Sequence, residues 1–107
     1  MSKPVEIDEA IFDEAVLQSK IPVLVDFWGQ NCRPCLMTEP IIDELAEDFD
    51  GEVSFVRVNV TNNPQITSQY GVMGLPTLMI FKEGKPVDTI IGFRPKDELR
   101  KSLETAL

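Results

Sequence analysis

Two cysteines, Cys32 and Cys35, are separated by two residues and are the only cysteines in the 107-residue chain. Before them, residues 23–28 form a β-branched and aromatic run, which predicts a strand buried on both faces. After them, apolar residues recur at helical spacing, at Ile42, Leu45, Ala46 and Phe49. The cysteine pair is therefore expected where a strand ends and a helix begins.

The start of a helix favours chemistry at Cys32. The first backbone N–H groups of a helix lack partners within it, and the helix dipole adds partial positive charge there. Both effects stabilise a thiolate, which is the form that attacks a disulfide, so we expect a lowered pKa for Cys32. One helical turn brings Cys35 back over Cys32, which allows a disulfide between them. Pro34 suits an early helical position because it has no N–H and a fixed φ.

Composition argues against other kinds of site. The net charge of −8 disfavours nucleic acid and anionic membranes as partners, and no apolar run approaches membrane-spanning length. The chain has no histidine, and two cysteines alone do not make the four-ligand zinc site of a monomer. We therefore expect no metal site. Dithiol chemistry is the favoured interpretation of the cysteine pair, and a metal half-site or a structural bond is the alternative.

Location and organisation follow from the rest of the sequence. The first eight residues contain no apolar stretch of the signal-peptide kind, which predicts a cytoplasmic location. In a reducing compartment a lone cysteine pair is more often catalytic or metal-binding than structural. Length and composition predict one domain over residues 1–107. We expect a monomer, although nothing in the sequence decides the oligomeric state.

The pattern of apolar residues predicts an α/β fold. Strands are expected over 3–7, 23–28, 53–60, 77–81 and 87–91, and helices after Asp8, over 33–49, from Pro64 and from Pro95. Crossover connections imply parallel pairing, and the turn at 83–85 implies an antiparallel hairpin. The expected architecture is a mixed five-stranded sheet with four helices over both faces.

Several details of these elements can be checked. Asp8 is expected to cap the first helix, and Pro40 to kink the second. The residues expected to face the core from the first, third and last helices are Ile11, Phe12, Ala15 and Val16, then Ile66 and Tyr70, then Leu99, Leu103 and Leu107.

Motifs spread over the whole chain resemble the thioredoxin family. They are Val-Asp-Phe-Trp before the cysteines, Cys32-x-Pro34-Cys35, Pro40, Tyr70-Gly71-Val72 leading to Pro76-Thr77, Phe81-Lys82-x-Gly84, and Gly92 before the last helix. The resemblance implies the thioredoxin fold. It also implies Cys32 as the attacking thiol, Cys35 as the resolving thiol and Pro76 in a cis peptide bond beside them.

The chain departs from the family pattern at the cysteines. The family usually has Trp-Cys-Gly-Pro-Cys-Lys, whereas this chain has Asn31 before Cys32, Arg33 between the cysteines and Leu36 after them. A guanidinium beside Cys32 would stabilise its thiolate and make the couple more oxidising. The alternative is a solvated Arg33 with little effect, because salt screens exposed charges.

Asp26 is a second candidate for the reaction. It interrupts the buried strand before the cysteines, so desolvation should raise its pKa. Such a carboxyl group can exchange a proton with Cys35 through water, a role that the resemblance supports. The alternative is a carboxylate held in an ion pair with Arg57 on the neighbouring strand. The two interpretations are compatible.

Residues around Pro76 are candidates for substrate binding. A cis Pro76 would turn the Leu75 backbone outward, where its N–H and C=O could pair with an extended substrate segment. An apolar patch around the cysteines would then comprise Trp28, Gly74, Leu75, Gly92 and Phe93. The alternatives are an ordinary trans loop proline and core packing, the latter strongest for Phe93.

The resemblance implies a protein disulfide reductase that carries electrons from a thioredoxin reductase to oxidised protein substrates, without a bound cofactor. The reductase type and the substrates are open. One alternative is a thiol oxidase or disulfide isomerase, which a raised potential would favour. Another is a non-catalytic binding subunit that uses the fold and not the cysteines.

Overall fold

The computed structural model describes residues 3–107, so the first two residues of the predicted domain lie outside the described part. One sheet contains five strands: β1 (Val5–Glu6), β2 (Val23–Trp28), β3 (Ser54–Asn59), β4 (Thr77–Lys82) and β5 (Lys85–Ile91). The helices are η1 (Glu9–Ile11), η2 (Asp13–Leu17), α1 (Arg33–Asp48), α2 (Pro64–Gln69) and α3 (Lys96–Ala106).

The sheet is mixed, as predicted. Its strand order is β1-β3-β2-β4-β5, in which β3 pairs parallel to both β1 and β2. β4 pairs antiparallel to β2 and to β5, which confirms the hairpin. Strand β2 therefore lies in the middle of the sheet, and its C-terminal end leads directly to the cysteines.

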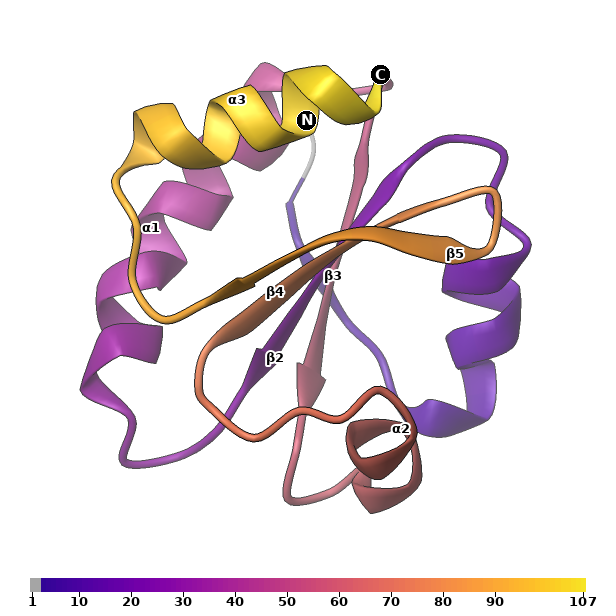
Figure 1. The fold of residues 1–107 in the computed structure, drawn as a ribbon, viewed down its shortest axis with the longest axis vertical. Helices are drawn as coiled ribbons and strands as arrows, with labels where there is room; N and C mark the ends of the chain where they lie inside the picture. The colour runs from indigo at the N-terminus through magenta and orange to yellow at the C-terminus, as the bar shows by residue number, and fades with distance from the viewer. Residues whose placement is uncertain (1–2) are drawn as a thin grey trace.

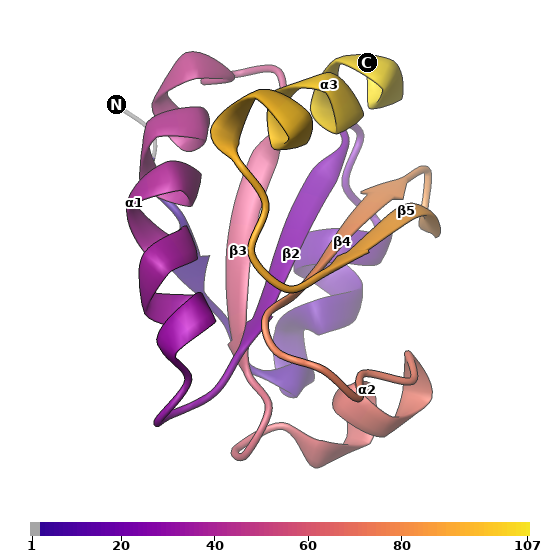
Figure 2. The same ribbon diagram turned by 60° about the vertical axis from the view of Figure 1, so that its left-hand side comes forward.

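Helices cover both faces of the sheet (Figures 1 and 2). Helices α1 and α3 lie on one face, where a core cluster joins their apolar side chains to Leu24, Phe55 and Leu78. η1, η2 and α2 belong to the other face, where a second cluster includes Val25 and Val58. Successive residues of a strand point to opposite faces, so a strand buried on both sides must be apolar almost throughout. In β2 this leaves Asp26 as a buried exception.

Helix α1 confirms the predicted helix after the cysteines. It runs from Arg33 to Asp48 without a break at Pro40, and Ile42, Leu45 and Ala46 are buried on the sheet. A kink at Pro40 stays a prediction. None of the helices within residues 3–107 is long and apolar enough to cross a membrane.

The first helical segment differs from the prediction. Asp8 caps it as expected, by accepting a hydrogen bond from Ala10 N at 3.0 Å. However, the segment is a 3-10 turn followed by a π-helical turn, and not a regular α-helix. The number of residues per turn in both segments differs from that of an α-helix. The side chains that face the core are Phe12 and Val16. The predicted burial of Ile11 is therefore wrong, because this residue is 44% exposed.

The last helix also needs a correction. Leu99 and Leu103 are buried, as predicted, but Leu107 is 51% exposed. Helix α3 ends at Ala106, which takes the inward position of the last turn. The helical spacing that predicts an inward Leu107 no longer applies beyond that point.

Candidate active site

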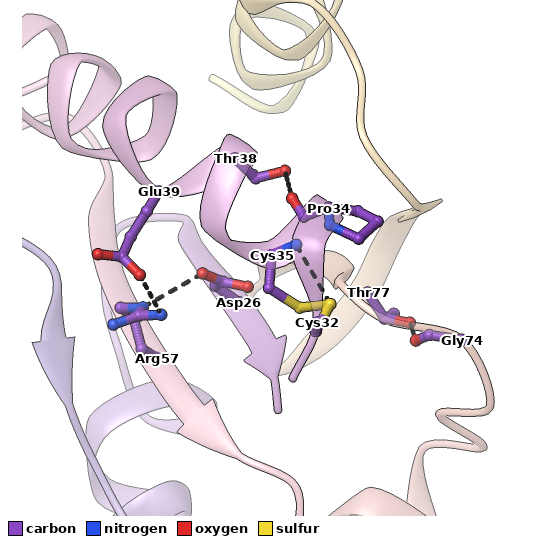
Figure 3. Close-up of a disulfide and its surroundings, with 9 residues drawn as sticks. All are labelled: Asp26, Cys32, Pro34, Cys35, Thr38, Glu39, Arg57, Gly74 and Thr77. Atoms are coloured by element: carbon purple, nitrogen blue, oxygen red, sulfur yellow. Dashed lines mark hydrogen bonds and ion pairs between the residues drawn. A yellow bond between two sulfur atoms is a disulfide. The ribbon is translucent and has the colours of Figure 1, made fainter. Parts of the chain in front are cut away.

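Cys32 and Cys35 form a disulfide at the beginning of α1 (Figure 3). Their Cα atoms are 5.3 Å apart, a separation that a disulfide spans readily. Cys32 is the N-cap residue, and its Sγ accepts a hydrogen bond from Cys35 N at 3.2 Å. Cys35 is only 4% exposed, whereas Cys32 is half-buried. Cys32 is therefore more exposed to solvent than Cys35.

Arg33 and Pro34 complete the first turn of α1. The Arg33 side chain is exposed, and it makes no ion pair with the residues that the structure describes. The backbone oxygen of Pro34 accepts a hydrogen bond from Thr38 Oγ1 at 2.7 Å. The first turn therefore carries the positive charge of Arg33 next to Cys32 in the sequence. The Thr38 hydroxyl ties the next turn to the Pro34 backbone.

Asp26 lies beneath the disulfide and is almost fully buried. One carboxylate oxygen, Oδ2, accepts a hydrogen bond from Arg57 Nε at 3.3 Å, which confirms the predicted ion pair. The other oxygen, Oδ1, has no hydrogen-bond partner among the described residues. In Figure 3 the Asp26 carboxylate lies between Arg57 and the Cys35 side chain. Arg57 thus holds one oxygen of Asp26, while the other is buried without a hydrogen-bond partner among the described residues.

Burial dominates the electrostatics of Asp26. Desolvation raises its pKa from the usual 3.8 to about 6, even though the Arg57 guanidinium lowers it. Glu39 and Glu6 raise the pKa further because their charges repel the ionised carboxylate. Asp26 therefore changes its protonation state close to neutral pH.

Arg57 has two further carboxylate partners that sequence reasoning missed. Its Nη2 lies 3.4 Å from Glu39 Oε2, and its Nη1 lies 3.9 Å from Glu6 Oε1. The guanidinium also lies over the Trp28 ring, 4.7 Å from its centroid. The contact of Glu6 with Arg57 follows from the register of β1 against β3, which places the two residues opposite each other. That register cannot be inferred from the sequence.

The loop before β4 lies beside the end of β2. The Leu75–Pro76 peptide bond is cis, as the resemblance implies. A Cβ added at Gly29, the residue after β2, would lie only 2.8 Å from Leu75 Cδ1. A larger residue at position 29 would therefore require the Leu75 side chain to move.

Gly74 and Gly92 join β5 to the same site. A Cβ at Gly74 would lie 2.8 Å from Ile91 Cγ2, and the Gly74 oxygen accepts a hydrogen bond from Thr77 Oγ1 at 2.6 Å. The Gly92 N–H donates to the Pro76 oxygen at 2.8 Å. The structure therefore brings together the predicted residues Gly74, Pro76 and Gly92.

Exposed apolar side chains extend over the elements that carry the site. Phe93 is 37% exposed, so it is not the core residue of the alternative interpretation, and Trp28 is half-buried. Sequence reasoning missed Met73 and Ile91, which are 96% and 55% exposed. Met73 precedes Gly74 and Ile91 precedes Gly92, so their position next to two predicted residues could have identified them in the sequence.

Carboxylates are absent from the segments that form this part of the molecule. The chain has 18 Asp and Glu residues, yet none lies within 27–38, 59–82 or 89–96. These three stretches carry the cysteines, the loop containing the cis proline and Gly92. These three stretches therefore bring no carboxylate to the surface around the cysteines, and the charged side chains they carry are Arg33, Lys82, Arg94 and Lys96.

No metal centre is formed by the described residues, since no group of three or more His, Cys, Asp or Glu side chains is placed to hold an ion.

Comparison with known proteins supports the same chemistry. The family model Thioredoxin matches residues 3–105. Thioredoxin 1 of Nostoc sp. (strain PCC 7120 / SAG 25.82 / UTEX 2576) is 46% identical over 107 residues, and thioredoxin 1 of Synechococcus elongatus is 47% identical over 107; both alignments cover the whole of each chain. Thioredoxin of Alicyclobacillus acidocaldarius is 44% identical over 94% of this chain and 95% of its own. The chain belongs to the thioredoxin family of protein-disulfide oxidoreductases.

Proposed function

We propose that this chain reduces disulfides of oxidised proteins through a mixed-disulfide intermediate. The observation that carries the proposal is the arrangement at the start of α1. There Cys32 is the accessible sulfur, Cys35 is buried behind it, and Asp26 lies beneath the pair with one oxygen unpaired. A thioredoxin reductase would return the electrons to the cysteine pair.

The first step uses the reduced protein. The Cys32 thiolate, stabilised by the free N–H groups of α1, attacks one sulfur of the substrate disulfide. The substrate S–S bond breaks, and the departing substrate thiolate takes a proton from solvent. Cys32 and the substrate are then joined by a new S–S bond.

The second step releases the substrate. Asp26 takes the proton of the Cys35 thiol, directly or through a water molecule, and the resulting Cys35 thiolate attacks Cys32 Sγ. The mixed disulfide breaks, the second substrate thiolate leaves, and the Cys32–Cys35 disulfide forms. Two electrons have then passed from the cysteine pair to the substrate.

Substrate binding is proposed at the loop of residues 74–76. Among the described residues, the Leu75 N–H and C=O make no hydrogen bond, so both can pair with an extended substrate segment. Trp28, Gly74 and Gly92 adjoin this backbone, and the exposed apolar side chains around it can cover the docked segment. A protein acting as a cytoplasmic monomer, as the sequence predicts, would present this surface freely.

The Asp26→Asn variant tests the proton transfer. We expect resolution of the mixed disulfide to slow by roughly 100-fold or more at neutral pH, because an amide cannot accept the Cys35 proton. Single-turnover rates of substrate release between pH 6 and pH 9 measure this step. Asp43→Asn is a matched control, because it removes an exposed carboxylate of α1 by the same change. If the Asp26→Asn rates equal those of wild type over this range, Asp26 has no such role.

The alternative of a thiol oxidase or disulfide isomerase depends on Arg33. If its charge stabilises the Cys32 thiolate, the Arg33→Gly variant will have a higher Cys32 pKa and a more reducing couple, by about 30 mV for each pKa unit. Redox titration of both proteins gives the midpoint potentials, and Arg33→Lys is the control that keeps a charge. Equal potentials for wild type and Arg33→Gly would mean that solvent screens the guanidinium.

A further inference from the structure

A row of three charged side chains crosses three neighbouring strands beneath the disulfide. In the register of the sheet, Glu6 of β1 lies opposite Arg57 of β3, and Arg57 lies opposite Asp26 of β2. Opposed residues in a sheet share one face. This is the α1 face, because Leu24 and Phe55, two residues before Asp26 and Arg57, pack in the cluster of α1 and α3. Arg57 thus lies between two carboxylates, one buried and one at the edge.

Glu6 contacts both Arg57 and Trp28. Trp28 Nε1 lies 3.1 Å from each Glu6 carboxylate oxygen, and its N–H donates a bifurcated hydrogen bond to them. Arg57 lies over the same indole, 4.7 Å from the ring centroid, and its Nη1 is 3.9 Å from Glu6 Oε1. Glu6, Arg57 and Trp28 therefore form a closed triangle of contacts, in which moving one member disturbs both others.

We propose that Glu6 is a positioning residue for the disulfide exchange, which holds the Trp28 ring and orients the Arg57 guanidinium that faces Asp26. The role rests on the proposed proton transfer at Asp26. Glu6 does not touch the sulfur atoms or the docked substrate in this account, and it acts through its two neighbours.

The charges that face Asp26 determine what Glu6 does to the reaction. They are Arg57 on β3, Glu39 on α1 and Glu6 on β1, while the opposed residue on β4, Leu78, is uncharged. Arg57 divides its N–H groups among three carboxylates, so the part that turns toward Glu6 is withdrawn from Asp26. The negative charge of Glu6 also opposes ionisation of Asp26. Both effects keep Asp26 protonated to higher pH.

Removing the charge of Glu6 should therefore shift the reaction to lower pH. In Glu6→Gln the midpoint of the Asp26-dependent resolution rate is expected to fall by about half a pH unit, because an anion at the partly exposed edge is removed. The amide oxygen still accepts from Trp28 Nε1, so the emission of Trp28, the single tryptophan of the chain, should stay close to that of wild type. In Glu6→Ala the midpoint falls as well, and the Trp28 emission changes because its indole has lost the acceptor.

The experiment measures single-turnover resolution rates and Trp28 emission in wild type, Glu6→Gln, Glu6→Ala and Glu104→Gln. Glu104 is exposed near the end of α3 and controls for the general loss of one negative charge. Thermal melts confirm that all four proteins are folded. A lower midpoint in both Glu6 variants and not in Glu104→Gln, with an emission change in Glu6→Ala alone, supports the proposal.

Failure of this inference can be told from failure of the proposed function. If both Glu6 variants keep the wild-type midpoint while Asp26→Asn slows the step, Asp26 moves the proton and Glu6 does not position its partner. If Asp26→Asn keeps the wild-type profile, the proton transfer itself is wrong, and the positioning role falls with it. An upward shift of the midpoint in Glu6→Gln would also overturn the inference, because the expected electrostatic sign would be reversed.

Discussion

Replacing Cys32 with serine is expected to lower the rate of disulfide reduction by roughly a thousandfold or more, because the attacking thiolate is lost. Cys35 does not substitute for it, since this residue is only 4% exposed within the first turn of α1. The Cys35→Ser variant should behave differently. It keeps the attacking sulfur and lacks the resolving one, so the mixed disulfide with substrate should accumulate to about one equivalent.

Reduction of insulin driven by dithiothreitol measures the first effect, and non-reducing electrophoresis followed by mass mapping measures the second. Thermal melts of the reduced proteins control for folding. Serine at either position removes the disulfide, so the two variants are matched in this respect and differ only in which sulfur remains. Full activity of Cys32→Ser would favour the non-catalytic binding subunit. Trapping through Cys35 in Cys32→Ser would reverse the order of the two sulfur atoms.

The second large effect is on stability. Asp26 has a pKa of 3.8 in an ordinary environment and about 6 in the fold, so the folded protein binds its proton more tightly than the unfolded chain does. The resulting stability is fully present below about pH 4 and is lost as the pH rises through about 6. At pH 8 the buried charge should cost about 2 to 3 kcal/mol. Asp26→Asn removes this charge, so its free energy of unfolding should exceed that of wild type by about this amount.

Urea denaturation of the oxidised proteins at pH 4 and pH 8 measures the difference. The advantage of Asp26→Asn is expected at pH 8 and should largely disappear at pH 4, where wild-type Asp26 is protonated in the folded state. Asp43→Asn provides the control, because it replaces an exposed aspartate by asparagine in the same protein. A destabilised Asp26→Asn at pH 8 would show that the Arg57 ion pair outweighs desolvation.

The main elements of the fold could be predicted because their signals are local. The buried β2 strand, the helical spacing after Cys35 and the short turn before β5 each follow from a few neighbouring residues. The cis proline came from the resemblance and not from the residues themselves, since most loop prolines are trans.

Predictions failed where local spacing did not describe the backbone. Ile11 was expected to face inward, but the segment combines 3-10 and π-helical turns, so an α-helical periodicity does not apply. Leu107 was expected on the inward stripe, but α3 ends at Ala106. In both cases a helical segment was correctly predicted, but its exact helix type or its last residue was not.

The charge network beneath the site was predicted only in part. The Asp26 and Arg57 pair could be inferred because both residues interrupt apolar strands that are neighbours in a crossover unit. Glu6 lies far away in the sequence on a two-residue edge strand, and its place opposite Arg57 depends on the register of β1 against β3. The contact between Glu39 and Arg57 depends on how α1 lies across the sheet. Such contacts require the tertiary structure.

The central claim is that the beginning of α1 makes Cys32 an acidic, attacking thiol. The most direct test is the rate of iodoacetamide alkylation of Cys32 in the reduced protein as a function of pH. The account predicts a midpoint clearly below about 8.5, the value of a free cysteine, with Cys32 modified before Cys35. A midpoint at or above that of a free thiol, or faster modification of Cys35, would contradict it.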